Sequence, residues 1–567
     1  MDTPTPHQRL GLEFTERMCG FLVPGPGGDF GEMEARKPPA AVPFEFTVNV
    51  STDDLDRMIE GPGHEAQITG AVTAPSLSGT PMTLSASVFT LFDEDPDRVE
   101  TRTMGYRLRM EGSEGRKLFL KGFKYIREEN MLHVWHDTTT LYITLHEGVD
   151  ASGPVVGRGI LHIEPADFLR ELTTLKVTNA ADKSEQLGGM ARFGSSFAGV
   201  LWRHYGGIFV GPTAFDPEAK PRLKRPLRAK PPEFHPFRTE DGLVLQLTRY
   251  NGGGKGPVIV SPGLGVSSLI FSIDTIGTNL LEFLFERGYD VWLLDFRTSI
   301  ALGTAGGQWD GDQVARYDYP GAVAKVREVT GAESVQFVVH CWGASTFFMA
   351  MLAGLKGVRS FVSSQIGAHF HSPVDVNLKT GLHVPQIFDA LGVKSLDAYA
   401  STTESWWEKL YDQALKMPAL LFAQGRCTSA TCHRITFMYA SLYCHEQLNE
   451  ATHENLHELF GVGNMRSFEH IAAVGRAGHL VDFSGGDVYL PHLERLNLPI
   501  AWVHGGENHC FLPKGTEETF ELLCSRFDPA QYSRHVIPGY GHIDCIFGKN
   551  ASVDVFPHIV AHLDKTN

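Results

Sequence analysis

The feature that most constrains the fold is a regular alternation of short apolar runs and helical segments in the second half of the chain. Apolar runs occupy residues 257–265, 289–296 and 334–340, and helical patterns at 279–288 and 319–331 separate them. Such runs are typical of strands buried on both faces of a parallel sheet and joined by crossover helices. We therefore predict an α/β fold, continued by later strands and a closing helix at 361–367, 499–506, 533–539 and 555–563.

The first part of the chain has a different pattern. Residues 141–148 alternate apolar and polar side chains, as a half-buried strand does. Similar short runs are separated by glycines, Asp-Pro or charge clusters, which favour hairpin turns. We expect residues 1–210 to form a mainly antiparallel β domain, a sandwich or a barrel, with trailing helices at 165–175 and 185–207.

Two further segments complete the predicted organisation. Residues 211–236 are rich in proline and basic residues, which favours an extended, solvated linker over an anion-binding arm. Residues 237–567 then form the α/β domain. Within it, the mostly helical stretch at about 370–497 is long enough to be a lid over the carboxyl ends of the strands.

Composition excludes some partners. The formal net charge of −16 disfavours non-specific binding to nucleic acid or anionic membranes. No apolar run reaches the ~18–20 residues of a spanning helix, and the N-terminus lacks the basic start and apolar core of a secretory signal. We expect a cytoplasmic protein with no nucleic-acid partner and no integral membrane segment.

Cysteine and glycine patterns give no strong sign of a metal or a cofactor. Cys427 and Cys432 lie close together with His433 beside them, but no second Cys or His pair completes a zinc motif. Packed thiols are therefore the favoured interpretation. The glycines from Gly252 precede a strand and do not open a helix, so they do not form a dinucleotide-binding turn. We predict no metal and no redox cofactor.

The peptide at residues 338–346, VVHCWGAST, carries the chemistry. An apolar strand runs into a sharp turn and then into a helix rich in small residues, which is the context of a nucleophile elbow. The usual pattern is G-x-S-x-G. Here the first glycine is absent and Cys341 stands at the serine position. A cysteine after a strand is also common in packed cores, so this peptide alone leaves both interpretations open.

Other segments supply the remaining parts of an acyl-transfer site. The backbone N–H of Trp342 and that of Leu264, in the loop at 261–265, are candidate oxyanion donors. His542 follows the last strand and is the candidate base. Glu507 and Asn508 follow the preceding strand as candidate orienting groups, and the chain order suits this fold. A cysteine at a helix N-terminus and beside a histidine is expected to be a thiolate.

At this point residues from Phe234 onward resemble the acid lipases, the gastric and lysosomal branch of the α/β-hydrolases. The resemblance rests on segments in the family's order: FRTEDGLVLQLTRY, PGLGVSS, RGYDVWLLDFRTS, RYDYPGAVAKVREVTG, the elbow, HGGENHCFLP and YGHIDCIFG. It implies a lipase-like hydrolase. Two departures stand out. Cys341 replaces the family's serine, as in polyhydroxyalkanoate synthases and dienelactone hydrolases. The family's aspartate falls on Asn508, so the implied triad is Cys–His–Asn, with Glu507 and then Asp544 as alternatives.

The N-terminal half is similar to a segment attached to the hydrolase part of bacterial, flavin-dependent sterol-oxidase-like proteins. This similarity implies a bacterial source and steroid-like or polycyclic substrates. It does not bring a flavin domain with it. The β domain is also a candidate dimer contact, so a homodimer is one expectation.

Three functions follow as hypotheses. The first is hydrolysis of an ester, thioester or lactone with an apolar part, through an acyl thioester on Cys341. The second is transfer of the acyl group to a hydroxyl, amine or thiol. The third is an inactive protein that binds lipid or steroid. His340 and Arg297 are candidate contacts for a small-molecule acyl substrate, although core packing and a turn-securing salt bridge are the simpler roles for them.

Overall fold

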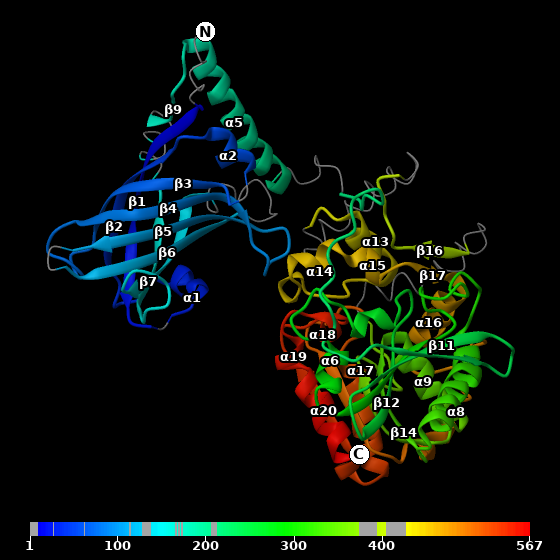
Figure 1. Ribbon diagram of the computed structural model, residues 1–567. Coiled ribbons are helices and arrows are strands. Elements are labelled where there is room, and N and C mark those ends of the chain that lie inside the picture. The colour runs from blue at the N-terminus through cyan, green and yellow to red at the C-terminus, as the bar shows by residue number, and fades with distance from the viewer. Residues whose placement is uncertain are drawn as a thin grey trace. The chain divides into compact units, whose positions relative to one another are not determined.

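The computed structural model describes residues 9–26, 28–61, 63–112, 115–126, 138–164, 167, 171, 174–205, 213–372, 394–403 and 427–567. The chain divides into two compact units. The first comprises residues 1–95 and 100–210, and the second comprises 96–99 and 211–567. Figure 1 labels their helices and strands.

The first unit is a closed antiparallel barrel. Strands β1 to β8 each pair with the next along the chain, and β1 pairs with both β2 and β8, so the sheet has no free edge among these eight. The short strand β9 adds to β1. The strands are β1 (Gly11–Pro24), β2 (Val42–Thr52), β3 (Glu65–Thr73), β4 (Met82–Glu94), β5 (Arg102–Glu111), β6 (Lys117–Ile126), β7 (Thr140–Glu147), β8 (Val155–His162) and β9 (Lys176–Thr178), and the helices are α1 (Phe30–Ala35), α2 (Leu55–Glu60) and α5 (Lys183–Tyr205).

Alternation of side chains explains the barrel. On β5, alternate residues from Met104 to Met110 are buried while their neighbours are more exposed. One inward position on β1 is charged: Glu16 pairs with Lys124 at 2.5 Å and accepts a hydrogen bond from the hydroxyl of Tyr106 at 2.7 Å. The prediction of a mainly antiparallel β domain is therefore confirmed. The expected helix at 165–175 falls largely outside the described residues.

The second unit contains an eight-stranded mixed sheet in the order β10-β11-β13-β12-β14-β15-β18-β19. The first two strands join by antiparallel pairings, and every later pairing is parallel. The strands are β10 (Glu233–Arg238), β11 (Val244–Asn251), β12 (Lys255–Ser261), β13 (Tyr289–Asp295), β14 (Val335–His340), β15 (Val358–Ser364), β18 (Ile500–Gly505) and β19 (Tyr532–Ile537).

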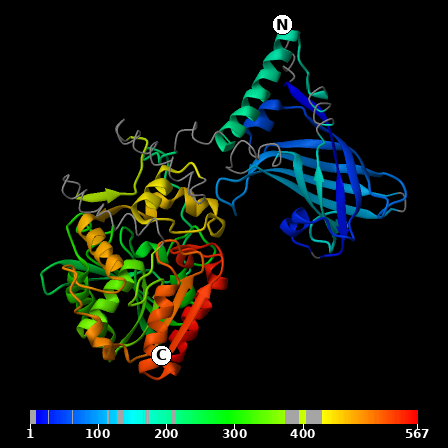
Figure 2. The same cartoon turned by 180° about the vertical axis from the view of Figure 1, so that it is seen from behind.

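Helices cover both faces of this sheet (Figures 1 and 2). Val258 and Val260 of β12 share a buried cluster with α6 and α20, whereas Ile259 belongs to a second cluster with α8, α9 and α17. This period of two marks a strand buried on both faces, which confirms the predicted parallel core. The helices are α6 (Leu280–Phe285), α7 (Gly311–Gln313), α8 (Tyr319–Thr330), α9 (Cys341–Ala353), α17 (Lys514–Arg526), α18 (Asp544–Phe547), α19 (Ala551–Asp554) and α20 (Phe556–Lys565).

A long insertion separates β15 from β18. Its described part contains a small β16–β17 ladder and several helices, and residues 373–393 and 404–426 lie outside the description. The elements are β16 (Ser395–Asp397), α13 (Ala430–Tyr439), η4 (His445–Gln447), α14 (Glu450–Glu454), α15 (Leu456–Leu459), β17 (Val462–Asn464) and α16 (Met465–Ala477). The expected lid at about 370–497 therefore corresponds to an insertion, and its action as a lid stays a prediction.

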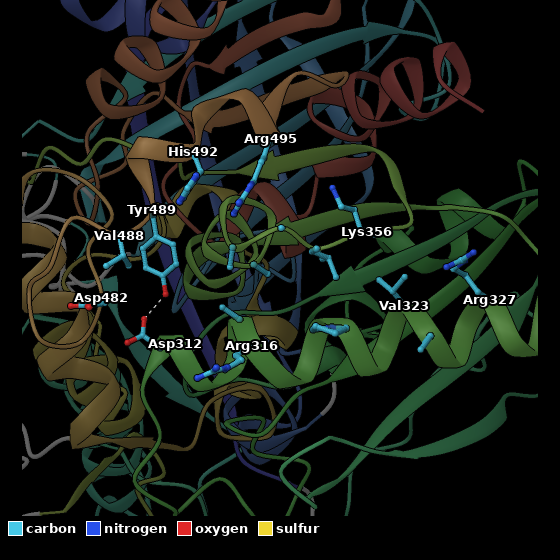
Figure 3. A pocket seen from close by; sticks show the side chains of 17 residues that line it. Asp312, Arg316, Val323, Arg327, Lys356, Asp482, Val488, Tyr489, His492 and Arg495 are labelled. Carbon is cyan, nitrogen blue, oxygen red and sulfur yellow. Dashed lines mark hydrogen bonds between the residues drawn. The ribbon is translucent and has the colours of Figure 1, made fainter.

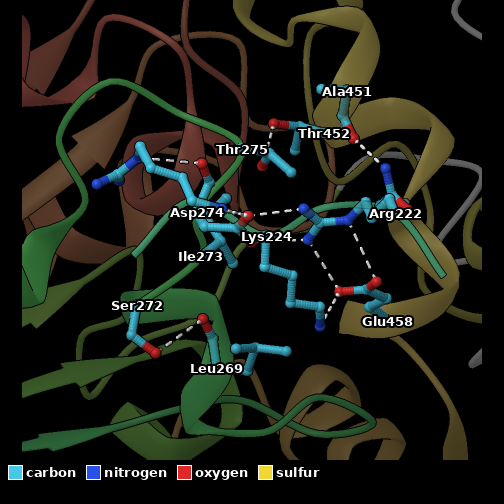
Figure 4. A network of polar contacts seen from close by, with 12 residues as sticks. Arg222, Lys224, Leu269, Ser272, Ile273, Asp274, Thr275, Ala451, Thr452 and Glu458 are labelled. Carbon is cyan, nitrogen blue, oxygen red and sulfur yellow. Dashed lines mark hydrogen bonds and ion pairs between the residues drawn. The ribbon is translucent and has the colours of Figure 1, made fainter. Parts of the chain in front are cut away.

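The proline- and base-rich segment is extended and mostly exposed, and ion pairs attach it to the second unit. Arg222 binds both Asp274, at 2.7 Å, and Glu458, at 3.0 Å (Figure 4). Arg225 pairs with Glu282 at 2.7 Å, and that carboxylate is fully buried. The segment thus packs on the second unit because its cations meet carboxylates there. Among the described residues, no helix has the length and apolar character needed to cross a bilayer.

Candidate active site

The turn between β14 and α9 holds Cys341 in a left-handed conformation, with φ of +56°. Few residues other than glycine adopt this conformation, and a nucleophile elbow requires it. The turn is tight because a Cβ on Gly343 would lie 2.0 Å from the carbonyl oxygen of Pro262. Cys341 as a residue keeps part of its surface accessible, whereas the strand before it and the helix after it are buried.

Two backbone N–H groups lie near the sulfur of Cys341 and lower the pKa of its thiol. They belong to Trp342, the next residue, and to Leu264, in the loop after β12. Gly263 makes this approach feasible, since a Cβ there would come within 2.8 Å of the Cys341 Cβ. Two converging N–H groups are the arrangement that stabilises a developing oxyanion. The structure thus brings Leu264 and Trp342 together at Cys341, and their role as oxyanion donors stays a prediction.

His542 lies beside the same sulfur. It follows β19, and its ring nitrogen lies within 4.8 Å of the Cys341 Sγ and of a ring nitrogen of His340. Within the described part of the chain, no atom hydrogen-bonds its buried Nε2. The main-chain N–H groups of His542 and Ile543 both donate to the carbonyl of Leu442, at 2.9 and 2.7 Å. The insertion therefore holds the histidine loop in place.

Asn508 orients the His542 ring. Its Nδ2 lies 3.0 Å from His542 Nδ1. Its Oδ1 accepts hydrogen bonds from the backbone N–H groups of Cys510 and Phe511, at 2.9 Å each, so the amide group must present Nδ2 to the imidazole. The Nδ1 of His542 is therefore an acceptor. A neutral ring then carries its proton on Nε2, toward Cys341, which is the reverse of the tautomer in a Ser–His–Asp triad.

Sequence comparison finds relatives among lipases and sterol esterases. Lipase lipl-1 of Caenorhabditis elegans is 23% identical over 394 residues, 61% of this chain and 93% of that protein. The Homo sapiens lysosomal acid lipase/cholesteryl ester hydrolase is 29% identical over 171 residues, 27% of this chain and 43% of that protein. Sterol esterase 2 of Saccharomyces cerevisiae is 29% identical over 136 residues, 21% of this chain and 25% of that protein. These last two are thus matched over less than half of their own length.

The second unit, or hydrolase unit, has an α/β-hydrolase fold and is similar to lipases. No protein-family model matches the chain. Among solved structures, the DcsB complex with its substrate analogue matches at a TM-score of 0.39 and 14% identity, over 59% of this chain and 100% of that one. A TM-score this low adds nothing to the strand order of the hydrolase unit.

Burial controls the protonation of the candidate active site. It raises the pKa of the Cys341 thiol to about 11, although the Trp342 and Leu264 N–H groups pull it down. Burial, with smaller contributions from His340 and His504, holds the pKa of His542 well below its usual value. Both shifts favour a neutral thiol and a neutral imidazole in the substrate-free state. The thiolate expected from the sequence stays a prediction that a titration of Cys341 tests.

Three other candidates have different outcomes. His340 lies at the site, donating or accepting at 3.0 Å with Ser364, and burial lowers its pKa to about 3. Glu507 is exposed, and the structure does not bring it to His542. For Arg297 the structure confirms the simpler role, a turn-securing salt bridge, and contradicts a contact with substrate. Its guanidinium is fully buried and bound by the carboxylates of Asp318, at 2.6 Å, and Asp241, at 2.9 Å, so it secures the fold.

The sequence interpretation missed two residues at the site. Gln365, directly after β15 and with φ of +76°, accepts from Asn508 Nδ2 at 2.9 Å and from the Gly505 N–H at 3.0 Å. Tyr439 of α13 reaches the oxyanion loop, where a Cβ on Gly265 would lie 1.9 Å from its hydroxyl. No local pattern marks either residue, because both act through contacts distant in sequence.

A separate groove of about 780 Å³ lies on the flank of the hydrolase unit (Figure 3). Asp312, Arg316, Arg327, Tyr489 and Arg495 are among its lining residues. It touches the C-terminal end of α9, whereas Cys341 is the first residue of that helix. Thirteen helical residues span roughly 18 Å at 1.5 Å per residue, so this groove is distinct from the elbow.

Proposed function

We propose that the protein is a cysteine-dependent acyl hydrolase for esters, thioesters or lactones with an apolar acyl or alcohol part. The observation that carries the proposal is the convergence of the Leu264 and Trp342 N–H groups and the His542 imidazole on the sulfur of Cys341. The likeness to lipases and a sterol esterase supports an ester of low polarity as the substrate class. Fold alone does not fix a substrate, so the class depends on the site and this likeness together.

The reaction begins when the Cys341 sulfur attacks the carbonyl carbon. The carbonyl oxygen becomes an oxyanion held by the Leu264 and Trp342 N–H groups, and the bond to the leaving group breaks to give a thioester. The thiol proton passes to His542 Nε2 and then to the leaving group. Hydrolysis repeats these steps with water as the nucleophile and restores the thiol.

This proton transfer needs a free lone pair on His542 Nε2, and hence an acceptor for a proton on Nδ1. In the substrate-free arrangement Asn508 presents a donor instead. The proposed cycle therefore requires the Asn508 amide to turn over when substrate binds, breaking the hydrogen bonds from Cys510 and Phe511 to its oxygen. That requirement slows acylation by stable esters and favours activated donors such as thioesters.

The same arrangement favours acyl transfer as a second candidate function. Water is a poor nucleophile and needs a base to attack the thioester, whereas a thiol or an amine needs much less help. An acceptor that enters beside His542 would then compete well with water. We therefore include transfer to a thiol or amine as an alternative fate of the same intermediate.

Intact-protein mass spectrometry tests the proposal. The protein is incubated with p-nitrophenyl esters, acyl thioesters and lactones of graded chain length, and the adduct is mapped by peptide digestion. We expect one acyl group on Cys341, lost in Cys341→Ala and kept in Cys510→Ala, which removes a buried thiol near Asn508. Adding an amine or thiol and comparing free acid with conjugate separates hydrolysis from transfer.

An acyl group on another residue would contradict the proposed enzyme. The absence of an acyl group with every donor would also contradict it, provided that the circular dichroism spectrum is native. The third hypothesis, an inactive lipid- or steroid-binding protein, would then be favoured, and equilibrium binding of the same compounds would measure it.

A further inference from the structure

Four potential metal ligands meet in the insertion of the hydrolase unit, away from the elbow. Cys427 precedes α13, Cys432 lies in its first turn, His445 begins η4 and His453 lies on α14. One ligand atom from each residue lies within 4.8 Å of all the others. The sequence showed both cysteines with His433 beside them and favoured packed thiols, because no second Cys or His pair was evident. The two histidines that complete the cluster are on separate short helices.

The geometry of this cluster suits a tetrahedral ion. With Zn–S near 2.3 Å and Zn–N near 2.0–2.1 Å, neighbouring ligand atoms in a tetrahedron are roughly 3.3–3.8 Å apart. Cys432 Sγ and His445 Nε2 are 3.6 Å apart. The others lie close enough that small side-chain rotations would bring all four to bonding distance of one point. The two cysteines have four residues between them, which is also typical of zinc sites.

The residues around the cluster bury it and form hydrogen bonds with both cysteines. Cys427, Cys432 and His453 are almost fully buried, so an ion there would be shielded from water. The hydroxyl of Tyr443 donates to Cys432 Sγ at 2.9 Å, and the ring of His433 binds the carbonyl of Cys427 at 2.8 Å. Hydrogen bonds of this kind orient metal ligands and stabilise thiolates.

We propose that Cys427, Cys432, His445 and His453 bind one structural Zn²⁺ ion in the insertion of the hydrolase unit. Two thiolates and two imidazoles with tetrahedral spacing are the ligand set that zinc prefers among the common divalent ions. Binding releases the two thiol protons and changes no oxidation state. All four positions are then occupied by protein atoms, so the ion is structural and takes no part in acyl transfer.

The proposed zinc site would fix two parts of the candidate active site. Residues between the second cysteine and the first histidine include Leu442, whose carbonyl holds the His542 loop, and Cys444, whose N–H donates to Asp544 at 3.0 Å. Helix α13, which contains Cys432, also places Tyr439 against the oxyanion loop at Gly265. An ion bound by α13, η4 and α14 would therefore fix the positions of His542 and of the oxyanion donors relative to each other. Metal loss is expected to lower activity through position and not through chemistry.

Metal analysis of the full-length protein tests the site directly. We expect about one zinc ion per chain after purification without added chelator, and a native mass shift of one zinc ion less two protons. Cys427 and Cys432 should resist alkylation until the metal is removed, while Cys524 should react throughout. Replacement by Co²⁺ should give the intense visible absorption of a tetrahedral cobalt–thiolate centre. These readouts do not depend on acyl-transfer activity, so the zinc site and the proposed function fail separately.

Variants locate the ion. Cys432→Ser and His453→Gln should abolish binding of stoichiometric zinc. Tyr443→Phe removes only the hydroxyl that donates to Cys432, and it should weaken zinc affinity by roughly 10–100-fold in chelator competition. Cys524→Ser is the matched thiol control. Cys341→Ser is the second control, because His340, Cys341 and His542 also lie within 4.8 Å of one another.

Three results would overturn the proposal. One is a metal-free protein that does not bind added Zn²⁺ although its thiols are reduced. Another is zinc lost in Cys341→Ser and kept in Cys432→Ser. The third is a Cys427–Cys432 disulfide in the active protein, found by peptide mapping without reductant.

Discussion

At the scale of single residues, one atom of Asn508 decides how His542 is protonated. Its Oδ1 is bound by two backbone N–H groups, so its Nδ2 faces the ring. An aspartate at 508 would keep those two N–H bonds with one oxygen and offer the other to a proton on Nδ1. The difference between a hydrolase triad and the observed arrangement is therefore the replacement of one oxygen by one nitrogen.

Asn508→Asp should accelerate acylation of Cys341. The new carboxylate would accept the Nδ1 proton, free Nε2 as a base, and stabilise the imidazolium. The reverse change in a serine protease costs about 10⁴ in kcat, and a thiol needs less help, so we expect roughly 10²-fold or more. Single-turnover acylation by a p-nitrophenyl ester measures it, with exposed Asn550→Asp as the control. An unchanged or slower rate in a folded variant would contradict the tautomer argument.

The rate of alkylation of Cys341 should depend on pH, because only the thiolate form of Cys341 reacts. A pKa of about 11 means that the thiolate is scarce at pH 7, so labelling by iodoacetamide should still rise with pH above 9. In Asn508→Asp the carboxylate favours the ion pair between the Cys341 thiolate and the His542 imidazolium, so the apparent pKa of the Cys341 thiol should fall. Peptide-level mass spectrometry follows Cys341 alone. A wild-type rate that is already constant above pH 7 would show an existing thiolate.

At the scale of elements, the strand–turn–helix from β14 to α9 depends on glycines at close contacts. Gly263 and Gly343 face each other across the elbow, and a Cβ at either would overlap the opposite segment. The β14–α9 turn is thus fixed by the absence of side chains on both sides. The loop after β12 can then place the Leu264 N–H on the sulfur.

Gly263→Ala should reduce acylation by at least about 10-fold and leave most of the fold intact. Its Cβ would sit 2.8 Å from the Cys341 Cβ and 3.1 Å from the sulfur, so the loop must move and the Leu264 donor with it. Losing one oxyanion donor costs about 10²–10³ in kcat elsewhere. Gly254→Ala, where no atom lies within 4 Å of the new Cβ, is the matched control. Equal rates for the two variants would remove Leu264 from the mechanism.

Elements also divide what the sequence could predict from what it could not. The strands and the elbow were predictable because periodicity and a turn are local signals. The sequence favoured a salt bridge for Arg297 but could not identify its partners, because Asp241 and Asp318 are far from it in the sequence. His445 and His453 were missed for a similar reason, since only the folded insertion brings their helices to the two cysteines. The amide orientation of Asn508 depends on backbone N–H groups, which no residue pattern reveals.

At the scale of the whole molecule, the basic segment after residue 211 belongs to the hydrolase unit. Its arginines meet Asp274, Glu282 and Glu458, and the pair of hydrogen bonds from Arg222 lowers the pKa of Asp274 to about 2. A chain with a net charge of −16 thus places part of its scarce positive charge where carboxylates would otherwise repel one another. The segment is held along the surface of this unit by these ion pairs.

Asp274→Asn in the full-length protein should lower the free energy of unfolding by about 1–3 kcal/mol at pH 7, since Arg222 loses a charged partner. The folded pKa lies below the unfolded value of about 3.9, so this contribution exists above pH 4 and disappears as pH falls through 2. Urea unfolding at pH 7, 5 and 3 measures the difference, with exposed Glu240→Gln as the control. A difference that grows toward acid would reverse the assigned sign.

The double acceptance by the Leu442 carbonyl has a practical consequence for mutagenesis. The group that receives the His542 and Ile543 N–H bonds is main chain, and every amino acid carries it. Scanning the insertion with alanine would therefore leave this link intact and report it as dispensable. Replacing the peptide bond before His542 or Ile543 by an ester, which deletes one donor and no side chain, is the chemical change that would expose it.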